Sequence, residues 1–405
     1  MSLEIVCVSH HAPPLNDAEA LCTARLLSAL VACGARVHLV AVEATPTLAP
    51  DIVTEVLDRR IRVTYVPAGR RASRFAGMVR YQYHGAHVEW MRSAIAATRE
   101  VLKQYSNPIL LSRACPWISN FVGYYCRDRA KAWVAHFSDP FPPHEWQNHW
   151  YSRFVRPINR CWARRILRHA DLVTVTCPNA IRYIEEKTGV AFRHKAEVVT
   201  HLALPKLKPG NFRLERKPDE FVVAHIGALM VRRRPDLLLK GALLAMERHP
   251  QIRFLQYGHV DEGILRLSQS SPAFGRLEIR HVENLSPRDA TDLRNYVDVN
   301  VCVDTDFGLP YSPMILLKYP HSVCAGKPLL MLSSEDSEMA RLTKKHGGGE
   351  FVPFSTAGAV ADAICRLFAQ RRSQPDLGRL AAYQAEFSPE RVVPAFVQRL
   401  EQLTK

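Results

Sequence analysis

The chain has 405 residues, 47% of them hydrophobic and 23% charged, which is typical of a globular protein with two domains of about 200 residues each. No apolar run approaches the roughly 20 residues that span a bilayer, and the N-terminus lacks the basic region and cleavage site of a signal peptide. The net charge of +15 favours anionic partners. No zinc finger, helix-turn-helix or RNP-like aromatic pattern occurs, so a membrane surface with a phosphorylated lipid fits this charge better than nucleic acid. The ten scattered cysteines show no metal-ligand spacing and are interpreted as reduced core thiols of a cytoplasmic protein.

Strand-like and helical segments alternate along the first half of the chain. The pattern predicts strands at 3–8, 37–42, 61–66, 109–111, 132–137 and 172–176, and helices at 19–33 and 87–105. A weak strand within 196–210 leads into the sequence LPKLKPG, which is typical of a linker. We therefore expect an N-terminal domain over residues 1–205.

The same alternation restarts after the linker. It predicts strands at 221–226, 252–256, 277–280, 299–303 and 329–332, and helices at 235–247, 286–296 and 357–371. A further helix and a last one at 390–403 complete the chain. We expect a second domain over 206–385 and a C-terminal helix, 386–405, that packs on the first domain. Alternating strands and helices predict an α/β fold with parallel sheets.

Ligands of open α/β sheets bind beyond the carboxyl ends of the strands, so the loops there are the candidate sites. The loop after Ile226 reads GALMVRRRPD. Gly227 allows a close approach of the backbone, the helix that Pro235 opens offers free N–H groups, and Arg232 and Arg233 supply bidentate donors for phosphate. The alternative is a solvated basic turn.

Two more loops follow strands of the second half. Glu283, after the strand at 277–280, is equally well interpreted as an acceptor for ribose or base and as a plain loop charge. Tyr311 lies where it can stack on or hydrogen-bond a sugar, and Ser312 where it can meet phosphate. For Asp304 and Asp306 of the same loop, the alternative is an ordinary connection.

The sequence PYSPMILLKYPHSVCAGKPLLML at 310–332 is the most specific signal in the chain. The apolar residues Met314, Ile315 and Leu317 predict a helix that ends at Gly326, followed by a buried strand. Lys318 would lie inside this helix, where it must reach water or meet an anion. His321 follows one turn later on the same face.

This stretch resembles the donor-sugar signature of nucleotide-sugar glycosyltransferases of the family 4-like type, which have two Rossmann-like domains facing a cleft, the GT-B fold. The resemblance implies that Lys318 contacts the diphosphate. It also implies that His321 stands where retaining relatives place a glutamate that holds the ribose, which favours inversion over retention.

Asp139 follows the predicted strand at 132–137 directly and is the candidate general base, since a carboxylate there can take a proton from an acceptor hydroxyl. The alternative is a turn, because Asp-Pro begins turns readily. His136 and His144 are alternates. The arrangement resembles the xanthan β-glucuronosyltransferase group, inverting GT-B enzymes in which Met230 and Lys318 would match residues that touch the donor.

Two groups of arginines predict a docking surface for a polyprenyl-diphosphate acceptor on an anionic membrane. Arg71 and Arg74 lie in a loop that mixes basic and apolar residues, and Arg153, Arg156, Arg160 and Arg164 recur on one face of a helix near 150–169. A solvated cationic face is the alternative.

The resulting hypothesis is a cytoplasmic glycosyltransferase, bound peripherally to the inner face of the cell membrane. It would move a sugar from a UDP-sugar to a lipid-linked saccharide in bacterial polysaccharide assembly, without metal or cofactor. Two alternatives stay open: a nucleotide-sugar epimerase on the same scaffold, and a degenerate, non-catalytic transferase subunit.

Overall fold

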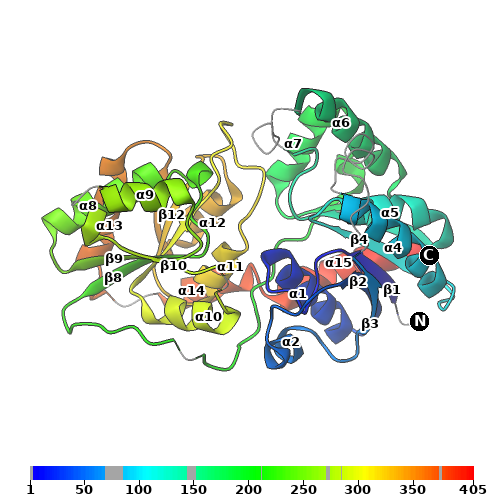
Figure 1. Ribbon diagram of the computed structural model, residues 1–405, viewed down its shortest axis with the longest axis horizontal. Helices are drawn as coiled ribbons and strands as arrows, with labels where there is room; N and C mark the ends of the chain where they lie inside the picture. Colours follow the sequence, from blue (N-terminus) through cyan, green and yellow to red (C-terminus); the bar gives the residue numbers. More distant parts are fainter. Residues whose placement is uncertain are drawn as a thin grey trace. The chain divides into compact units, whose positions relative to one another are not determined.

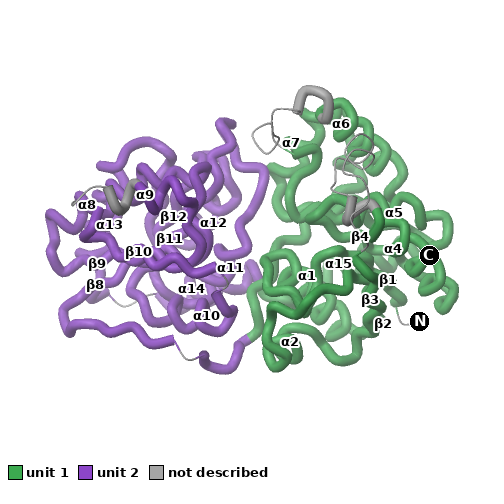
Figure 2. Tube along the Cα trace, in the orientation of Figure 1, with its two compact units in different colours: residues 1–205, 388–405 green, residues 206–387 purple. Residues whose placement is uncertain are grey.

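The structure is a computed structural model that describes residues 3–68, 85–143, 152–210, 212–270, 274–283, 285–373 and 376–405. The chain divides into two compact units, shown in Figure 2. Unit 1 comprises Met1–Pro205 and Ser388–Lys405, and unit 2 comprises Lys206–Phe387. Each unit is built on its own parallel sheet.

Unit 1 alternates strands and helices along the chain (Figure 1). Its strands are β1 (Glu4–Ser9), β2 (Arg36–Glu43), β3 (Arg62–Pro67), β4 (Ile109–Ala114), β5 (Ala132–Phe137), β6 (Leu172–Val175) and β7 (Ala196–Val198). Its helices are α1 (Ala18–Ala32), α2 (Pro50–Val56), α4 (Gly85–Leu102), α5 (Ile118–Cys126), α6 (Ser152–His169), α7 (Pro178–Thr188) and α15 (Pro389–Thr404). Among the described residues the strand order is β3-β2-β1-β4-β5-β6-β7. The order reverses direction between β1 and β4, which is where such sheets bind ligands.

The central strands of unit 1 are buried on both faces, which explains their nearly continuous apolar sequences. All six residues of β4 and of β5 are buried. Helix α1 begins at an N-cap, Asp17, whose carboxylate accepts a hydrogen bond from the Ala20 N–H at 2.8 Å. The last helix of the chain, α15, contacts α1, so the C-terminus belongs to the unit that begins the chain.

Unit 2 repeats the architecture with its own strands and helices. Its strands are β8 (Phe221–Ile226), β9 (Ile252–Gly258), β10 (Glu278–His281), β11 (Val299–Val303), β12 (Leu329–Ser333) and β13 (Gly349–Pro353). Its helices are α8 (Pro235–Arg248), α9 (Glu262–Ser270), α10 (Pro287–Tyr296), α11 (Lys318–Cys324), α12 (Glu338–His346), α13 (Ala357–Ala369) and α14 (Leu377–Ala385). The order of these described strands, β10-β9-β8-β11-β12-β13, reverses direction between β8 and β11.

Two apolar layers cover the unit 2 sheet. On one side, alternate residues of the strands, such as Val223 and Phe254, pack against α8 and α13. On the other, Val222 and Leu255 pack against Ala290 and Leu293 of α10. The period of two along the strands thus sends alternate side chains into opposite layers. The two sheets and their helix layers confirm the predicted α/β fold.

The helix predicted from Met314 onward is wrong at its start. Helix α11 begins only at Lys318, and the residues before it form a non-helical segment that the Ser312 N–H anchors to the Asp336 carbonyl at 3.0 Å. Pro313 follows Ser312 and disfavours helical backbone in the preceding residue. Ile315 and Leu316 are buried without a helix around them. Lys318 therefore opens the helix, and the prediction that it lies inside is also wrong.

Candidate functional site

The carboxyl end of β8 leads into the predicted donor loop, and Gly227 is its first residue. This glycine has a φ of 112°, which side-chain-bearing residues rarely adopt. Gly258, at the end of the neighbouring β9, packs directly against it: a β-carbon on Gly258 would lie 2.7 Å from the Gly227 carbonyl oxygen. Two strand ends therefore meet backbone to backbone, which fixes where the loop starts.

The arginines of this loop have different partners. Arg234 forms ion pairs with Asp236 at 3.1 Å and Asp306 at 3.4 Å. The Arg233 guanidinium donates to the Ala228 carbonyl and is half-buried, so it closes the loop on itself. Arg232 is exposed, and Met230 is 36% exposed. Arg233 is thus the loop arginine that the fold turns inward.

Lys318 meets the end of β8 through a histidine that the sequence did not single out. Its Nζ forms a hydrogen bond with Nε2 of His225. This histidine is the penultimate residue of β8 and is fully buried. Burial lowers the pKa of Lys318 well below its ordinary value, and the charge of Arg233 lowers it further. Among the described residues no carboxylate lies within ion-pair distance of Lys318. The fold therefore holds a cationic group here without a matched anion.

A second cation is buried in the same region. Arg294, on α10, is 7% exposed, and its Nε has no hydrogen-bond partner among the described residues. Burial lowers the pKa of its guanidinium to about 10. The positive charge of Arg294 also lowers the pKa values of Lys318 and His225, so the three groups share one electrostatic environment. Uncompensated buried cations are costly unless an anion joins them.

The candidate counter-charge for Lys318 is the buried carboxyl group of Asp304. It follows β11 and is fully buried, and burial raises its pKa to about 6 although Ser333 donates to it at 2.6 Å. The Thr305 N–H also donates to it at 2.7 Å, and Ser312 is a further hydrogen-bond partner. Asp304 is therefore held by neutral donors and does not neutralise Lys318 by a direct contact.

The remaining predicted donor residues differ in accessibility. Tyr311 is only 2% exposed, which leaves little of its ring for stacking on a sugar, and Ser312 is fully buried, with Oγ donating to the Met314 carbonyl at 3.3 Å. His321 lies one turn after Lys318 on α11 and is half-buried. Tyr311 and Ser312 are thus buried in the segment before α11.

Glu283 belongs to a cluster with two histidines. Its Oε1 lies 2.8 Å from His281 Nε2 and 3.4 Å from His259 Nδ1, and the hydrogen bond from His281 lowers its pKa. These three side chains are close enough together to hold a metal ion. However, Nδ1 of His281 accepts the Val260 N–H at 3.2 Å, so Nε2 carries the proton and cannot ligate a metal in this arrangement. The cluster is best described as a hydrogen-bonded group that holds the Glu283 carboxylate.

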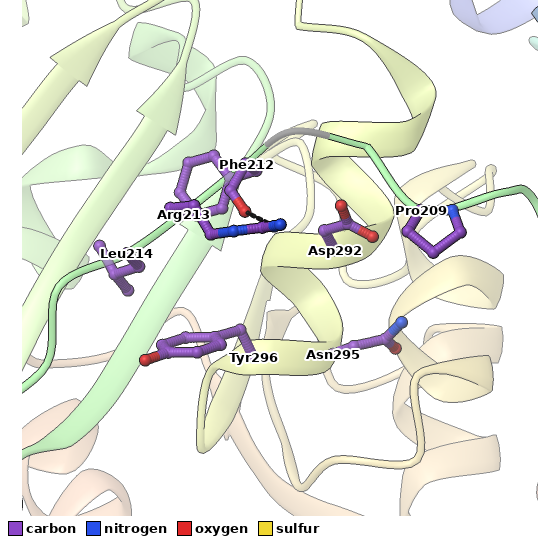
Figure 3. A pocket seen from close by; sticks show the side chains of 7 residues that line it. All are labelled: Pro209, Phe212, Arg213, Leu214, Asp292, Asn295 and Tyr296. Atoms are coloured by element: carbon purple, nitrogen blue, oxygen red, sulfur yellow. Dashed lines mark hydrogen bonds between the residues drawn. The ribbon is translucent and has the colours of Figure 1, made fainter.

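A pocket of about 380 Å³ lies elsewhere in unit 2 (Figure 3). It is formed by the segment before β8 and by α10, and its lining residues are Pro209, Phe212, Arg213, Leu214, Asp292, Asn295 and Tyr296. No predicted donor residue lines it, so it is not the predicted donor site.

In unit 1 the corresponding strand edge carries charges that are paired. Arg113, at the end of β4, is 2% exposed and donates to the Glu19 carboxylate at 2.9 Å. Its guanidinium also donates to Thr23 Oγ1 at 3.0 Å and Ser138 Oγ at 3.2 Å, while Ser138 donates to Glu19 at 2.7 Å. The buried positive charge of Arg113 therefore has a carboxylate partner within unit 1.

Asp139 follows Ser138 and is half-buried just beyond β5. Burial raises the pKa of the nearby Cys115 thiol, and the negative charge of Asp139 raises it further, as does that of Glu19. Asp139 thus lies at the edge beside the Arg113 group. His136 is buried within β5, where Nδ1 shares a hydrogen bond with Thr174 at 2.8 Å.

A second acid–base group at this edge was not predicted. His11 lies two residues after β1, and its Nδ1 is 3.0 Å from the Asp17 carboxylate. Burial disfavours the charged imidazole, but the hydrogen bond and charge of Asp17 outweigh it and raise the pKa of His11. The sequence signal was available, since two histidines follow the first strand and precede an acidic N-cap.

The predicted docking arginines are only partly described. Arg71 and Arg74 lie outside the described residues, as does the side chain of Arg153 and all of His144. Arg156, Arg160 and Arg164 are exposed along α6, opposite buried residues such as Trp162 and Ile166. Arg164 is tied down, because its Nε donates to the Thr188 carbonyl at 2.7 Å. Within the described part of the chain, no helix is both long and apolar enough to cross a bilayer.

Sequence reasoning missed His225, Gln256 and Arg294 for different reasons. His225 and Gln256 stand in apolar strand runs, and their partnership depends on a strand register that the sequence does not display. Arg294 carried a signal: it shares a helical stripe with Ala290, Leu293 and Val297, which are buried, so an arginine at that position must enter the core.

Residues 20–201 match the family described as Glycosyl transferase 4-like domain, and they fall within unit 1. No curated protein sequence matches this chain significantly. The fold is similar to that of a sucrose-phosphate synthase from Thermosynechococcus elongatus, with a TM-score of 0.71, 19% identity and 99% of each chain covered.

It is also similar to HepE from Anabaena in complex with UDP and glucose, with a TM-score of 0.68, 14% identity, and 99% of this chain and 100% of that one covered. A third similar structure is the pneumococcal O-GlcNAc transferase GtfA in complex with UDP and GlcNAc, with a TM-score of 0.63, 10% identity and 99% of each chain covered. Residues 20–201 are thus similar to the Glycosyl transferase 4-like domain, and the two units together have the GT-B fold of these structures.

Proposed function

We propose that this protein is a GT-B glycosyltransferase that transfers a sugar from a nucleotide diphosphate donor, a UDP-sugar, to a hydroxyl group of a lipid-linked saccharide. The observation that carries the proposal is the cationic group at the β8–β11 switch point, where the half-buried Lys318 and the buried Arg294 have no described carboxylate partner. A diphosphate supplies the charge that this site lacks.

UDP is the nucleotide we propose, because HepE and GtfA, which share the fold, are complexes with UDP. Gly227, Met230 and the loop arginines Arg232 and Arg233 would line the donor, with Lys318 on its diphosphate. Glu283, held by His281 and His259, would face the nucleoside, and His321, Tyr311 and Ser312 would complete the support.

The proposed reaction is a direct displacement with inversion. The Asp139 carboxylate takes the proton of the acceptor hydroxyl while that oxygen attacks the anomeric carbon. The bond from the anomeric carbon to the diphosphate oxygen breaks, its electron pair stays on UDP, and Lys318 stabilises the charge that develops there. No step requires a metal ion. Inversion rests on the resemblance of Asp139, Met230 and Lys318 to the xanthan β-glucuronosyltransferase pattern and on His321.

The acceptor is proposed to be a polyprenyl-diphosphate-linked saccharide of bacterial polysaccharide assembly, presented at the cytoplasmic face of the cell membrane. The support is the net charge of +15 and the exposed arginines of α6, Arg156 and Arg160. Binding to vesicles that contain anionic lipid should fall when both arginines are replaced by glutamine. Replacing Arg182 and Arg193, which are also exposed but lie outside α6, is the matched control.

The first experiment is a thermal-shift screen against UDP-, GDP- and dTDP-sugars, because a ligand that binds the native state raises its melting temperature. We expect a UDP-sugar to give the largest shift. A protein that no nucleotide sugar stabilises would instead be a non-catalytic subunit. A protein that converts a UDP-sugar without acceptor would be an epimerase.

The second experiment assigns the base. Asp139→Asn should lower transfer by about 10²- to 10⁴-fold with donor affinity unchanged. His11→Gln is the comparison, because His11 and Asp17 form an acid–base pair at the same edge. If Asp139→Asn keeps full transfer and His11→Gln loses it, the base is His11.

A further inference from the structure

A continuous chain of hydrogen bonds joins the donor loop to Lys318. His225 of β8 and Gln256 of β9 stand opposite one another in the parallel register, and both are fully buried. Gln256 Nε2 donates to the Gly227 carbonyl at 2.9 Å, and Gln256 Oε1 lies 2.5 Å from His225 Nδ1. His225 Nε2 in turn contacts Lys318 Nζ. We refer to His225 and Gln256 as the relay pair.

The direction of each bond in this chain follows from chemistry. The Gly227 carbonyl can only accept, so the amide nitrogen of Gln256 faces it and the amide oxygen faces His225. That oxygen can only accept, so Nδ1 of His225 carries the proton. Burial lowers the pKa of His225 well below its ordinary value, and the charge of Lys318 lowers it further, so the ring is neutral. Nε2 is therefore a lone-pair acceptor, and Lys318 must donate to it.

This arrangement holds Lys318 without neutralising it. A carboxylate in place of His225 would pair with the ammonium group and compete with any incoming anion. The charged groups around Lys318 are Arg233 of the loop, Arg294 of α10 and Asp304 after β11, and the Cys302 thiol of β11 lies beside them. The two arginines repel the ammonium group, whereas Asp304 is engaged with Ser333 and Thr305. A neutral acceptor thus fixes the position of the Lys318 amine without a counter-charge, so an incoming anion can favour its charged form.

The same chain also fixes the loop. Gln256 donates to the carbonyl of Gly227, the first residue after β8. Gly258 packs against the same carbonyl so closely that a β-carbon would not fit between them. Lys318 is 93 residues away from His225 in the sequence. The relay pair therefore couples two ligand-facing segments that no local interaction could place relative to each other.

We propose that His225 and Gln256 are positioning residues for the nucleotide-sugar donor, which hold the Gly227 loop and the Lys318 ammonium group as one hydrogen-bonded unit for its diphosphate. This inference rests on the proposed donor site. It assigns to two buried strand residues a part in donor binding, although neither needs to touch the donor.

The test is calorimetric binding of UDP to wild type, His225→Phe, Gln256→Met and Gln256→Glu in two buffers of different ionisation enthalpy at pH 8. The two buffers also give the number of protons taken up. Loss of one buried hydrogen-bond partner should raise the Kd for UDP about tenfold in His225→Phe and Gln256→Met. Wild type should take up protons on binding, because the diphosphate favours the charged form of Lys318, whose pKa burial lowers.

Proton uptake by Gln256→Glu distinguishes a positioning role from a merely structural one, because a structural role would leave proton uptake unchanged. A carboxylate at position 256 would favour a proton on His225 or Lys318 before UDP arrives, so proton uptake on binding should fall below that of wild type. The carboxylate of this variant also cannot donate a hydrogen bond to the Gly227 carbonyl. Phe254→Leu, a buried change two residues earlier on β9, is the matched control, which should lower the melting temperature and leave Kd and proton uptake unchanged.

The outcomes separate the two proposals. If wild type does not bind UDP, the proposed donor site is wrong. If wild type binds UDP and all three relay variants, folded by thermal melting, bind it with unchanged affinity and unchanged proton uptake, the relay is structural only and this inference is overturned.

Discussion

Charged side chains at the carboxyl edges of the two sheets have different kinds of partner. In unit 1, Arg113 is buried against the Glu19 carboxylate, Thr23 accepts from its Nε, and Ser138 accepts from its Nη2. In unit 2, the half-buried Lys318 contacts a neutral histidine, and the buried Arg294 has an unsatisfied Nε among the described residues. The same fold thus builds a closed ion pair at one switch point and an open cationic site at the other. This difference supports the proposal that unit 2 binds an anion, and the unit 1 edge has its counter-charge within the protein.

The largest effect is expected from breaking the closed pair. Arg113→Met leaves the Glu19 carboxylate buried without its partner and should reduce the free energy of unfolding by about 3–5 kcal/mol. Chemical denaturation measures this change. Adding Glu19→Gln should recover part of the loss, because the uncompensated charge is then gone. A single variant as stable as wild type would mean that the ion pair does not organise this edge.

Removing the central cation of the open site should act on function instead. Lys318→Met should weaken UDP binding and sugar transfer by about 10²- to 10³-fold, since Lys318 is proposed to stabilise the leaving diphosphate. The control is Lys240→Met, an exposed lysine of α8, which should behave as wild type. Retention of wild-type transfer by Lys318→Met would place the diphosphate elsewhere.

Arg294→Met sharpens the contrast with Arg113→Met. Replacing a buried cation that lacks a described carboxylate partner by an apolar side chain should leave the melting temperature unchanged or raise it. The Kd for UDP should rise about tenfold, because one positive charge near the diphosphate is lost. A fall in stability as large as that of Arg113→Met would show that Arg294 is paired and that the comparison between the two edges fails.

The last prediction concerns Asp304 and the dependence of stability on pH. Burial raises its pKa to about 6 in the folded protein, above the unfolded value of about 3.9, so its contribution to stability is present below pH 4 and is lost as the pH rises through 6. Asp304→Asn removes this dependence and should gain up to about 2–3 kcal/mol relative to wild type between pH 4 and pH 7. Stability curves of the two proteins that stay parallel over this range would contradict the assignment.

The sequence predicted the fold well because parallel strands buried on both faces leave continuous apolar runs that are easy to recognise. Short or irregular pieces escaped: β13 is half-exposed and begins at Gly349, and helix α12 was not predicted although Ser337 caps its start. The helix expected from Met314 failed because apolar residues before Lys318 are buried by an irregular segment that follows Pro313.

For the candidate site, the sequence identifies residues that follow strands but not the partners that reach them across the sheet. Gly227, Lys318 and Asp139 could be found from their place after strands or in a motif. Their roles remain predictions. The link from Gly227 to Lys318 depends on His225 and Gln256 facing each other in adjacent strands, which is a matter of register. Charge pairing is equally invisible, since nothing local shows that Arg113 has a carboxylate partner and Lys318 does not.

The most direct measurement is the affinity of the wild type and Lys318→Met for UDP and for uridine, by calorimetry at constant ionic strength. If the open cationic site receives a diphosphate, wild type should bind UDP at least about a hundredfold more tightly than uridine, and Lys318→Met should lose most of that difference. Equal affinities of wild type for UDP and uridine, or a preference that survives in Lys318→Met, would contradict the account.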